Sequence, residues 1–262
     1  MASTALFTEE RRVRILELIR EHKKMTVAEL CRRLEVSPAT MRGDLRDLDR
    51  EGLLVRTHGG AMERWRASFE QVSSKRSNKN LQAKQAIAAE ADRLVDDGDT
   101  ILLDTGTTTL ELARRLLARR ALTVVTNDLE IARTLEEAPG IQLVLLGGMI
   151  RKGFHCTVGP AGLRMADDLR VDKAFMATNS LSLEAGAATP DLQHAETKKA
   201  MIAIARRVVL LCDSSKIGKQ SFVRFADLGQ IDTFITERLG DEDRLALEER
   251  GIEVVLAGKA QS

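Results

Sequence analysis

Apolar residues in the first sixty positions recur every three or four residues, which is the spacing of one buried helical face. The pattern predicts three short helices: the first from about Thr8 to Glu21, the second opening at Thr26 and the third opening at Ser37. Thr26 and Glu29 make a capping box, in which each side chain satisfies a free backbone amide, and Ser37 is a favourable N-cap. The three apolar stripes are Ile15, Leu16 and Ile19; Val27, Leu30, Cys31 and Leu34; and Met41, Leu45 and Leu48.

The third predicted helix carries arginines away from its apolar stripe. Arg42, Arg46 and Arg50 lie four residues apart and share an exposed face. Gly52 ends the helix, and residues 53–60 then read as a strand followed by a tight glycine turn, the pattern of a β-wing. A small helical bundle with solvated arginines is the alternative. The capped helices, the short turn between them and the glycine-tipped wing together favour a winged helix-turn-helix that binds double-stranded DNA.

The distribution of charge supports this interpretation modestly. Residues 1–80 carry 17 Lys and Arg against 12 Asp and Glu, whereas residues 81–262 carry 23 against 27. A basic N-terminal end suits a polyanionic partner. Three cysteines without CxxC spacing and four scattered histidines predict no disulfide framework, no metal site and no cofactor. No apolar run approaches the length that spans a bilayer, so we expect a cytoplasmic protein without a membrane partner.

The pattern changes after the wing. Residues 63–80 are rich in Arg, Lys, Ser and Asn, and we interpret them as a linker whose Trp65 and Phe69 dock onto one of two domains. From Leu81 onward, nearly wholly apolar runs alternate with helical segments, which predicts an α/β domain with a largely parallel sheet covered on both faces. The predicted domains are 1–62, the linker 63–80, and 81–262. The predicted strands are Thr100–Asp104, Leu122–Thr126, Ile141–Leu146, Lys173–Thr178, Val208–Asp213, Ile231–Thr236 and Glu253–Ala257, and the predicted helices between them include Thr108–Leu117, Leu129–Glu136, Ala195–Arg206 and Asp241–Arg250.

Polar and glycine residues follow the predicted strands, where open α/β sheets bind their ligands. The segment Asp104–Thr109 joins a strand to a helix, and its glycine, successive threonines and free helix amides make a candidate phosphate cradle. It matches neither a P-loop nor a dinucleotide fingerprint, and a plain turn with a threonine cap is the alternative. Lys216 is expected to neutralise the phosphate and Asn127 to hold a sugar hydroxyl, although each could instead cap a helix or fill a turn. The candidate ligand-binding residues are Asp104, Thr105, Gly106, Thr107, Thr108, Thr109, Thr126, Asn127, Gly147, Gly148, Arg151 and Lys216.

At these residues the chain resembles the DeoR family of bacterial sugar-catabolism regulators. The resemblance covers Arg12–Met62, including the wing segment Gly52–Ala61, and nearly all of the C-terminal region. It implies a winged helix-turn-helix followed by an α/β sensor domain related in fold to ribose-5-phosphate isomerase. It also implies a phosphorylated sugar as effector and a homodimer or homotetramer on repeated operator half-sites. The C-terminal segments that carry it are Leu103–Leu112, Val124–Asn127, Leu145–Gly148, Asp172–Met176, Thr189–Met201, Asp213–Lys216 and Ile231–Thr236.

One departure from the family pattern concerns DNA. The family has a basic residue between Arg42 and Asp44, where this chain has Gly43. The missing side chain removes a phosphate or base contact, and a glycine in mid-helix costs about 0.5–1 kcal/mol relative to alanine. Asp44 lies nearer the buried face, so we interpret it as structural and paired with a neighbouring arginine.

A second departure concerns chemistry. The isomerases carry acidic residues in the loop that reads Asn179–Leu183 here, so no general base is placed for proton transfer at a sugar carbon. Glu196 and Lys198 do match the family pattern, and the resemblance implies that they bind the sugar, with a capped helix start as the alternative. His194, where relatives carry an acidic residue, is expected either to tune effector choice or to be a surface histidine.

The sequence therefore predicts a transcription regulator, a repressor of a sugar or polyol operon that a phosphorylated sugar induces. An isomerase-like enzyme with an appended DNA-binding module and a transcription activator are the rival hypotheses. The residues expected to meet the operator are Ser37, Ala39, Thr40, Arg42, Gly43, Arg46, Arg50, Arg56 and His58.

Overall fold

The computed structural model describes residues 7–22, 24–51, 53–63, 70 and 72–258. Its contacts divide the chain into two compact units, which we call the N-terminal unit (Met1–Arg66) and the C-terminal unit (Ala67–Ser262). The boundary falls inside the segment that the sequence marks as a linker. The aromatics of that segment, Trp65 and Phe69, lie outside the described residues.

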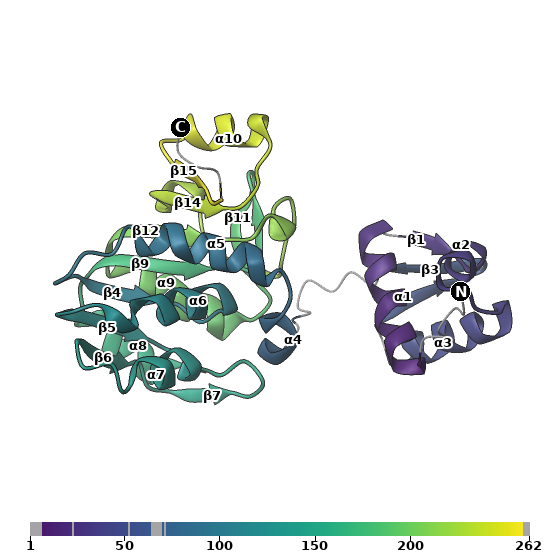
Figure 1. Ribbon diagram of the computed structural model, residues 1–262, viewed down its shortest axis with the longest axis horizontal. Helices are drawn as coiled ribbons and strands as arrows, with labels where there is room; N and C mark the ends of the chain where they lie inside the picture. Colours follow the sequence, from purple (N-terminus) through teal and green to yellow (C-terminus); the bar gives the residue numbers. More distant parts are fainter. Residues whose placement is uncertain (1–6, 23, 52, 64–69, 71, 259–262) are drawn as a thin grey trace. The chain divides into compact units, whose positions relative to one another are not determined.

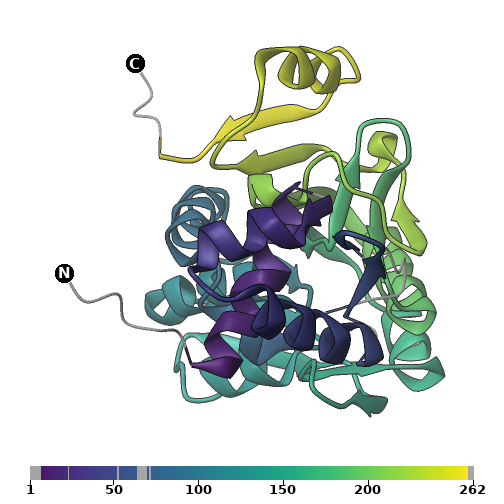
Figure 2. The same ribbon diagram turned by 90° about the vertical axis from the view of Figure 1, so that its right-hand side faces the viewer.

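Three helices and a three-stranded antiparallel sheet form the N-terminal unit (Figures 1 and 2, purple to dark blue). The capping box of Thr26 and Glu29 is present, and Ser37 caps the third helix by accepting a hydrogen bond from the Thr40 amide at 3.1 Å. The two helix starts and the wing are thus confirmed. The elements are α1 (Thr8–His22), β1 (Lys24–Thr26), α2 (Val27–Leu34), α3 (Pro38–Arg50), β2 (Leu54–Thr57) and β3 (Gly60–Glu63).

Strand β1, which the sequence pattern does not reveal, completes this small sheet in the order β1-β3-β2. It has only three residues, too few to show alternation. Its pairing with β3 sets Thr26 opposite Gly60. A Cβ atom at Gly60 would lie 2.0 Å from the carbonyl oxygen of Met25, so the strands can approach only because position 60 is glycine.

A seven-stranded parallel sheet in the order β15-β14-β12-β9-β4-β5-β6 forms the centre of the C-terminal unit (Figure 1). All seven predicted strands are in it, which confirms the α/β fold class. Because every pairing is parallel, all strands end at one side of the sheet, which we call the carboxyl edge. The strands are β4 (Thr100–Leu103), β5 (Leu122–Thr126), β6 (Ile141–Leu145), β9 (Val171–Ala177), β12 (Ala205–Leu211), β14 (Thr233–Thr236) and β15 (Glu253–Leu256).

Helices cover both faces of this sheet (Figure 1). Successive strand residues point to opposite faces, so Ile101 and Leu103 join the core beneath α5–α7, whereas Leu102 joins the core beneath α8 and α9. The three layers explain why the strands are nearly wholly apolar. The helices are α5 (Leu81–Asp92), α6 (Thr107–Arg115), α7 (Leu129–Leu135), α8 (Pro160–Asp167), α9 (Leu192–Ala203) and α10 (Asp241–Glu248), with 3₁₀ turns η1 (Leu116–Ala118), η2 (Ser214–Lys216) and η3 (Leu228–Gln230).

Short strands at the carboxyl edge were not predicted, because three or four residues carry too little periodicity. One pair forms a hairpin, and three others form a small antiparallel sheet in the order β10-β11-β13. The hairpin strands are β7 (Met149–Arg151) and β8 (Cys156–Val158), and the small sheet consists of β10 (Ser180–Ser182), β11 (Gly186–Thr189) and β13 (Val223–Ala226).

Helix α9 (Leu192–Ala203) lies three residues nearer the N-terminus than the predicted range Ala195–Arg206, so both predicted ends are wrong. The reason is Asp191, whose carboxylate accepts a hydrogen bond from the His194 amide at 2.8 Å and caps the helix. Arg206 belongs to β12 instead.

Part of the predicted linker is built onto the C-terminal unit. Helix α4 (Ser73–Ser77) lies there, with the Ser73 amide donating to the Gly153 carbonyl at 2.9 Å. The ammonium of buried Lys84, on α5, donates to the Arg76 carbonyl and so stabilises the end of α4. These tertiary contacts, which composition does not reveal, make the described residues after position 70 part of the C-terminal unit.

Candidate functional site

The exposed face of α3 presents the side chains expected to contact DNA. Arg42 and Arg46 are exposed, and neither has a carboxylate partner within the described parts of the chain. Arg50 is exposed but pairs with Asp47 at 3.6 Å. Unpaired guanidinium groups on one helix face suit phosphate oxygens and guanine edges. At the helix start, the predicted contact residues Ser37, Ala39 and Thr40 are exposed as well.

Asp44 ties α3 to α1 through a bidentate ion pair. Arg11 donates from Nε to Asp44 Oδ2 at 2.6 Å and from Nη2 to Oδ1 at 3.2 Å. The structural role predicted for Asp44 is confirmed. A Cβ atom at the adjacent Gly43 would meet nothing within 4 Å, so no packing contact requires glycine there. The glycine leaves open surface between Arg42 and Arg46.

The wing carries two further candidate contacts, Arg56 and His58, and both are exposed. His58 lies in the turn between β2 and β3. The Arg56 amide donates to Asp49 at 3.4 Å, which ties the wing to the end of α3. Helix face and wing therefore belong to one small folded unit.

The carboxyl edge of the large sheet is organised around a buried ion pair. Asp104, after β4, is fully buried and pairs with Lys198 from α9. The Ala177 amide donates to the same oxygen, Oδ2, at 2.8 Å, and Lys198 Nζ also donates to the Ala177 carbonyl at 2.8 Å. Burial raises the pKa of Asp104, while the charge of Lys198 and the backbone donors oppose that rise. The pairing of β4 with β9 brings these groups together.

His194 faces the second oxygen of Asp104. Its side chain is 5% exposed, so the surface position considered from the sequence is wrong. Nε2 lies 4.0 Å from Asp104 Oδ1, and neither atom has a hydrogen-bond partner among the described residues. Burial, followed by the positive charges of Lys198, Arg151 and Arg76, lowers the pKa of His194 well below its ordinary value. The imidazole is therefore neutral.

The neighbouring hydrogen bonds favour one tautomer of His194. The Thr189 hydroxyl donates to Asn179 Oδ1 at 3.0 Å and lies 3.3 Å from His194 Nδ1. Because the Thr189 hydroxyl donates its single proton to Asn179, its oxygen accepts a hydrogen bond from Nδ1–H of His194. The other ring nitrogen, Nε2, then carries no proton and is an acceptor. Two acceptors, Nε2 and Asp104 Oδ1, thus face each other.

Two hydroxyls of the threonine-rich segment Asp104–Thr109, which we call the threonine-rich bend, already donate hydrogen bonds within the protein. The Thr105 hydroxyl donates to Asp128 at 2.5 Å, and the Thr109 hydroxyl donates to a carbonyl of its own turn at 2.8 Å. Thr107 is half-buried and Thr108 is buried, and both lie in the first turn of α6, which has no side-chain cap. The first-turn amides and the hydroxyls of these two residues are the groups suited to an anion.

Gly106 has a packing reason in this bend. Its φ of 168° is extended backbone. A Cβ atom there would lie 2.7 Å from the Ala177 Cβ and 3.2 Å from the Thr109 hydroxyl. The glycine thus lets the start of α6 approach β9, whereas the sequence suggested the approach of a ligand.

Thr126, the last residue of β5, and Asn127, which follows it, are fully buried. The Thr126 hydroxyl donates to the Leu103 carbonyl at 2.7 Å, and Asn127 Nδ2 donates to the Thr157 carbonyl at 2.9 Å. The described residues offer no donor to Asn127 Oδ1. Thr126 therefore acts in the turn, while Asn127 keeps one free acceptor.

Three predicted site residues, Glu196, Gly147 and Gly148, make no hydrogen bond or ion pair with the buried pair of Asp104 and Lys198 in the described part of the chain. Glu196 is exposed and pairs with Lys199 at 2.8 Å, so α9 does not bring it to Lys198. Gly148 is exposed with φ of +145°, and Gly147 donates its amide to Met165 Sδ at 3.4 Å. The two glycines serve the turn into the β7–β8 hairpin.

Lys216 is the last residue of η2, the 3₁₀ turn that follows β12. Its ammonium donates to the Thr178 carbonyl at 3.1 Å and pairs with Asp213 at 3.7 Å. Burial opposes ionisation of Asp213, but Lys216 and nearby hydrogen-bond donors leave its pKa lowered. Burial, followed by the charge of Lys216, lowers the pKa of Lys84 to about 8. This corner of the carboxyl edge therefore holds two lysine side chains beside the Asp213 carboxylate.

Arg151 is occupied by a carboxylate from the predicted linker. The side chain of Glu70 is 4% exposed, and its Oε2 lies 2.7 Å from Arg151 Nη1. Its Oε1 lies 3.1 Å from Arg76 Nη1 and accepts from Asn179 Nδ2 at 2.9 Å. The Phe154 ring lies 3.8 Å from the Arg151 guanidinium, which helps to fix that group.

The sequence pattern does not single out Glu70, Arg76 or Thr189. One signal was available, because Glu70 is the single acidic residue in the basic stretch 64–80. Nothing in the sequence pairs that residue with Arg151, eighty-one positions away.

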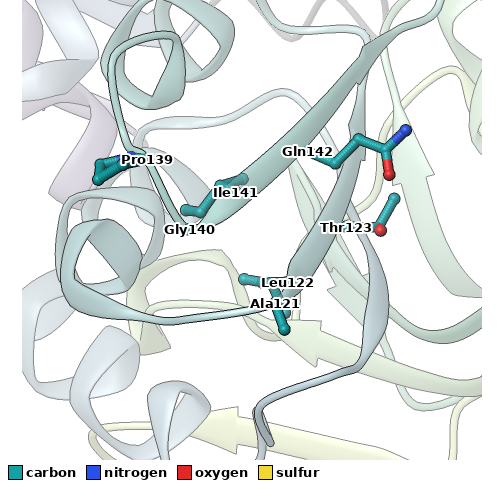
Figure 3. A pocket seen from close by; sticks show the side chains of 7 residues that line it. All are labelled: Ala121, Leu122, Thr123, Pro139, Gly140, Ile141 and Gln142. Atoms are coloured by element: carbon teal, nitrogen blue, oxygen red, sulfur yellow. The ribbon is translucent and has the colours of Figure 1, made fainter.

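A separate hollow of about 390 Å³ lies at the amino ends of β5 and β6 (Figure 3). Its lining includes Thr123 and Gln142 but no ionisable side chain. Ligands of open α/β sheets bind at the opposite ends of the strands, so we do not assign the site here. Within the described residues, no group of three His, Cys, Asp or Glu is placed to hold a metal ion. No helix in those ranges has the length and apolarity to span a bilayer.

Comparison with known proteins gives matches over both units. Residues 79–238 match the DeoR C terminal sensor domain, and residues 11–63 match the DeoR-like helix-turn-helix domain. The chain is 38% identical over 247 residues to the HTH-type transcriptional regulator GlpR of Haloferax volcanii, covering 94% of this chain and 96% of that protein. It is 33% identical over 252 residues to the HTH-type transcriptional repressor GlcR of Bacillus subtilis, covering 96% and 97%.

A third relative, the putative aga operon transcriptional repressor of Escherichia coli O157:H7, is 31% identical over 255 residues, covering 96% of this chain and 95% of that protein. Among solved structures, ribose 5-phosphate isomerase A from Methanocaldococcus jannaschii aligns with 53% of this chain and 55% of its own. The identity is 23% and the TM-score 0.41.

Proposed function

The chain belongs to the DeoR family of DNA-binding transcription regulators, and from that premise we propose that it represses a sugar or polyol operon and is induced by a phosphorylated sugar. Two relatives are named as repressors, GlcR and the aga operon protein. The operator contacts would come from the exposed face of α3, led by Arg42 and Arg46, and from the wing.

The observation that carries the proposal is the pair of facing acceptors at the carboxyl edge. Asp104 Oδ1 and His194 Nε2 are buried, 4.0 Å apart and without donors from the described residues. A buried acceptor that lacks a donor costs about 1–3 kcal/mol. Neighbouring sugar hydroxyls supply two donors side by side, whereas a phosphate, itself an acceptor, would be repelled there. This site suits the hydroxyl end of the effector.

The phosphate end suits the first turn of α6. Thr107 and Thr108 add hydroxyl donors to the free amides of that turn, and the helix dipole favours an anion. Lys216 and Arg151 would contribute positive charge from neighbouring strand ends. Effector binding would then favour one arrangement of the sensor and change the spacing of paired DNA-binding units in a homodimer or homotetramer.

A thermal-shift screen of the full chain against pentose and hexose phosphates tests this proposal. A ligand at 100 times its Kd stabilises the folded state by about 2.7 kcal/mol, so the effector would raise Tm. The double variant Thr107→Ala/Thr108→Ala is expected to lose that shift and to keep its affinity for an operator selected from random duplexes. A normal shift and normal operator release in the double variant would move the phosphate site elsewhere.

A sugar-phosphate isomerase is the second candidate. The observation that favours it is Asp104, a buried carboxyl with a raised pKa beside Lys198, since perturbed groups of this kind occur in active sites. Against it, Asn179–Leu183 contains no carboxylate and Glu196 faces solvent. Proton NMR of the protein with sugar phosphates separates the two, because only an enzyme interconverts aldose and ketose.

A further inference from the structure

Glu70 is held as a ligand would be held. Its two carboxylate oxygens receive Arg151 at 2.7 Å, Arg76 at 3.1 Å and Asn179 at 2.9 Å. Both guanidinium groups lie near the Phe154 ring, at 3.8 and 5.9 Å from its centre. Two arginines and an amide that converge on one anion are the donor set expected for a carboxylate or phosphate.

These three side chains include a buried hydrogen-bond donor from which the Glu70 carboxylate does not accept. Arg76 Nε is buried and has no acceptor among the residues described. A carboxylate has two oxygens, whereas a phosphate monoester presents three to its protein. A phosphate in place of the Glu70 carboxylate would bring the additional oxygen that this unused donor lacks.

A chain of contacts joins Glu70 to the facing acceptors. Asn179 donates to Glu70 and accepts from Thr189, whose oxygen in turn accepts from His194 at 3.3 Å. His194 then faces Asp104 at 4.0 Å. Arg151 also lies 3.5 Å from Asp191, which caps the helix carrying His194. A change at Glu70 therefore reaches the candidate sugar site through side chains in contact.

Glu70 is also close in the sequence to the N-terminal unit. It lies four positions after the boundary at Arg66, and its partner Arg76 is on α4. Helix α4 packs against α6, which begins at the same carboxyl edge. The contact between α4 and α6 thus connects the helix that carries Arg76 with the helix proposed to bind the phosphate.

We propose that Arg76, Arg151 and Asn179 complete the phosphate site that the proposed function places at the first turn of α6, and that the Glu70 carboxylate occupies these three groups in the unliganded protein. The inference rests on the proposed function, because it names the regulation of that site. Phosphate binding displaces the Glu70 carboxylate and so breaks the contacts that hold Glu70 to Arg76, Arg151 and Asn179. The chain's own carboxylate thereby couples effector binding to the connection with the DNA-binding unit.

Glu70→Gln in the full chain tests this with inorganic phosphate as the probe. Removal of the competing charge should tighten phosphate binding, measured by calorimetry, on the order of tenfold. Hydrogen exchange of peptides covering Ser73–Ser77 should speed up without phosphate in this variant, and only with phosphate in the wild type. Glu90→Gln is the matched control, because Glu90, on α5, pairs with Arg93 just after that helix, and this variant should behave as the wild type.

Three outcomes would overturn the inference. Phosphate binding no tighter in Glu70→Gln than in Glu90→Gln excludes competition. Tight phosphate binding that survives Arg151→Met in the Glu70→Gln background places the anion elsewhere. If Glu70→Gln does not fold, Glu70→Asp replaces it, since the shorter carboxylate should loosen its hold and tighten phosphate binding; no tightening refutes the competition. These readouts contain no operator, so failure of sugar phosphates to release DNA would overturn the proposed function alone.

Discussion

The buried pair of Asp104 and Lys198 predicts two variants with opposite pH dependence. Lys198 is 1% exposed and Asp104 is fully buried, so removal of either partner leaves an uncompensated buried charge. We expect Lys198→Met and Asp104→Asn each to lower the free energy of unfolding by about 3–5 kcal/mol. That is a large fraction of the roughly 5–15 kcal/mol that stabilises a typical domain.

The sign of the pH effect follows from which charge is left. In Lys198→Met, the lone Asp104 binds a proton more readily in the folded state than in the unfolded state. The loss in free energy of unfolding relative to the wild type should therefore shrink as the pH falls. In Asp104→Asn the lone Lys198 gives up its proton more readily when folded, so the deficit should shrink as the pH rises. Each slope can reach about 1.4 kcal/mol per pH unit, the value for one proton.

Urea-dependent hydrogen exchange between pH 6 and 9, read on peptides from β4 and β9, measures these deficits in the C-terminal unit alone. The double variant Asp104→Asn/Lys198→Met should recover most of the loss and show little pH dependence, because it buries no charge. Parallel pH profiles for the two single variants, or losses that simply add in the double variant, would refute the reasoning.

Three further predictions concern single side chains. Arg46→Ala should weaken operator binding by about 1–3 kcal/mol in an anisotropy titration. The control is Arg14→Ala, which removes an exposed arginine paired with Glu17 on α1 and should change operator binding little; equal effects of the two variants would show that Arg46 is not in the interface. Gly43→Ala should raise the stability of the N-terminal unit by about 0.5–1 kcal/mol, because its Cβ meets no neighbour, and a loss would show that the glycine is needed. The lowered pKa of His194 means that below about pH 6.5 the unfolded chain binds a proton that the folded chain does not, so the free energy of unfolding of the wild type should fall there by up to about 1.4 kcal/mol per pH unit. His194→Gln should show a shallower fall, and an unchanged slope would contradict the lowered pKa.

The repeating pattern of the chain was enough to predict its main elements. Amphipathic spacing and caps located the three helices of the N-terminal unit, and seven apolar runs gave the seven strands of the large sheet. These signals are local, so they can be read from neighbouring residues. The short strands β1, β7, β8, β10, β11 and β13 were missed because their pairing depends on distant partners.

The sequence predicts which residues lie at the carboxyl edge, but it does not predict which partners their side chains contact there. Parallel strands necessarily bring Asp104, Asn127 and Asp213 to one edge. Which groups remain free depends on tertiary contacts: Thr105 is committed to Asp128, and Glu196 turns away from the site. The occupation of Arg151 by a linker carboxylate depends on chain segments far apart in sequence, which no local pattern reports.

The most direct test of the central claim is the affinity of the identified sugar phosphate for the protein alone and for the protein bound to its operator, measured by titration calorimetry. Coupling between two binding sites is reciprocal and typically amounts to 1–3 kcal/mol. We predict that operator weakens sugar-phosphate binding about 5- to 150-fold, by the same factor as the sugar phosphate weakens operator binding. Equal sugar-phosphate affinity with and without operator would contradict it.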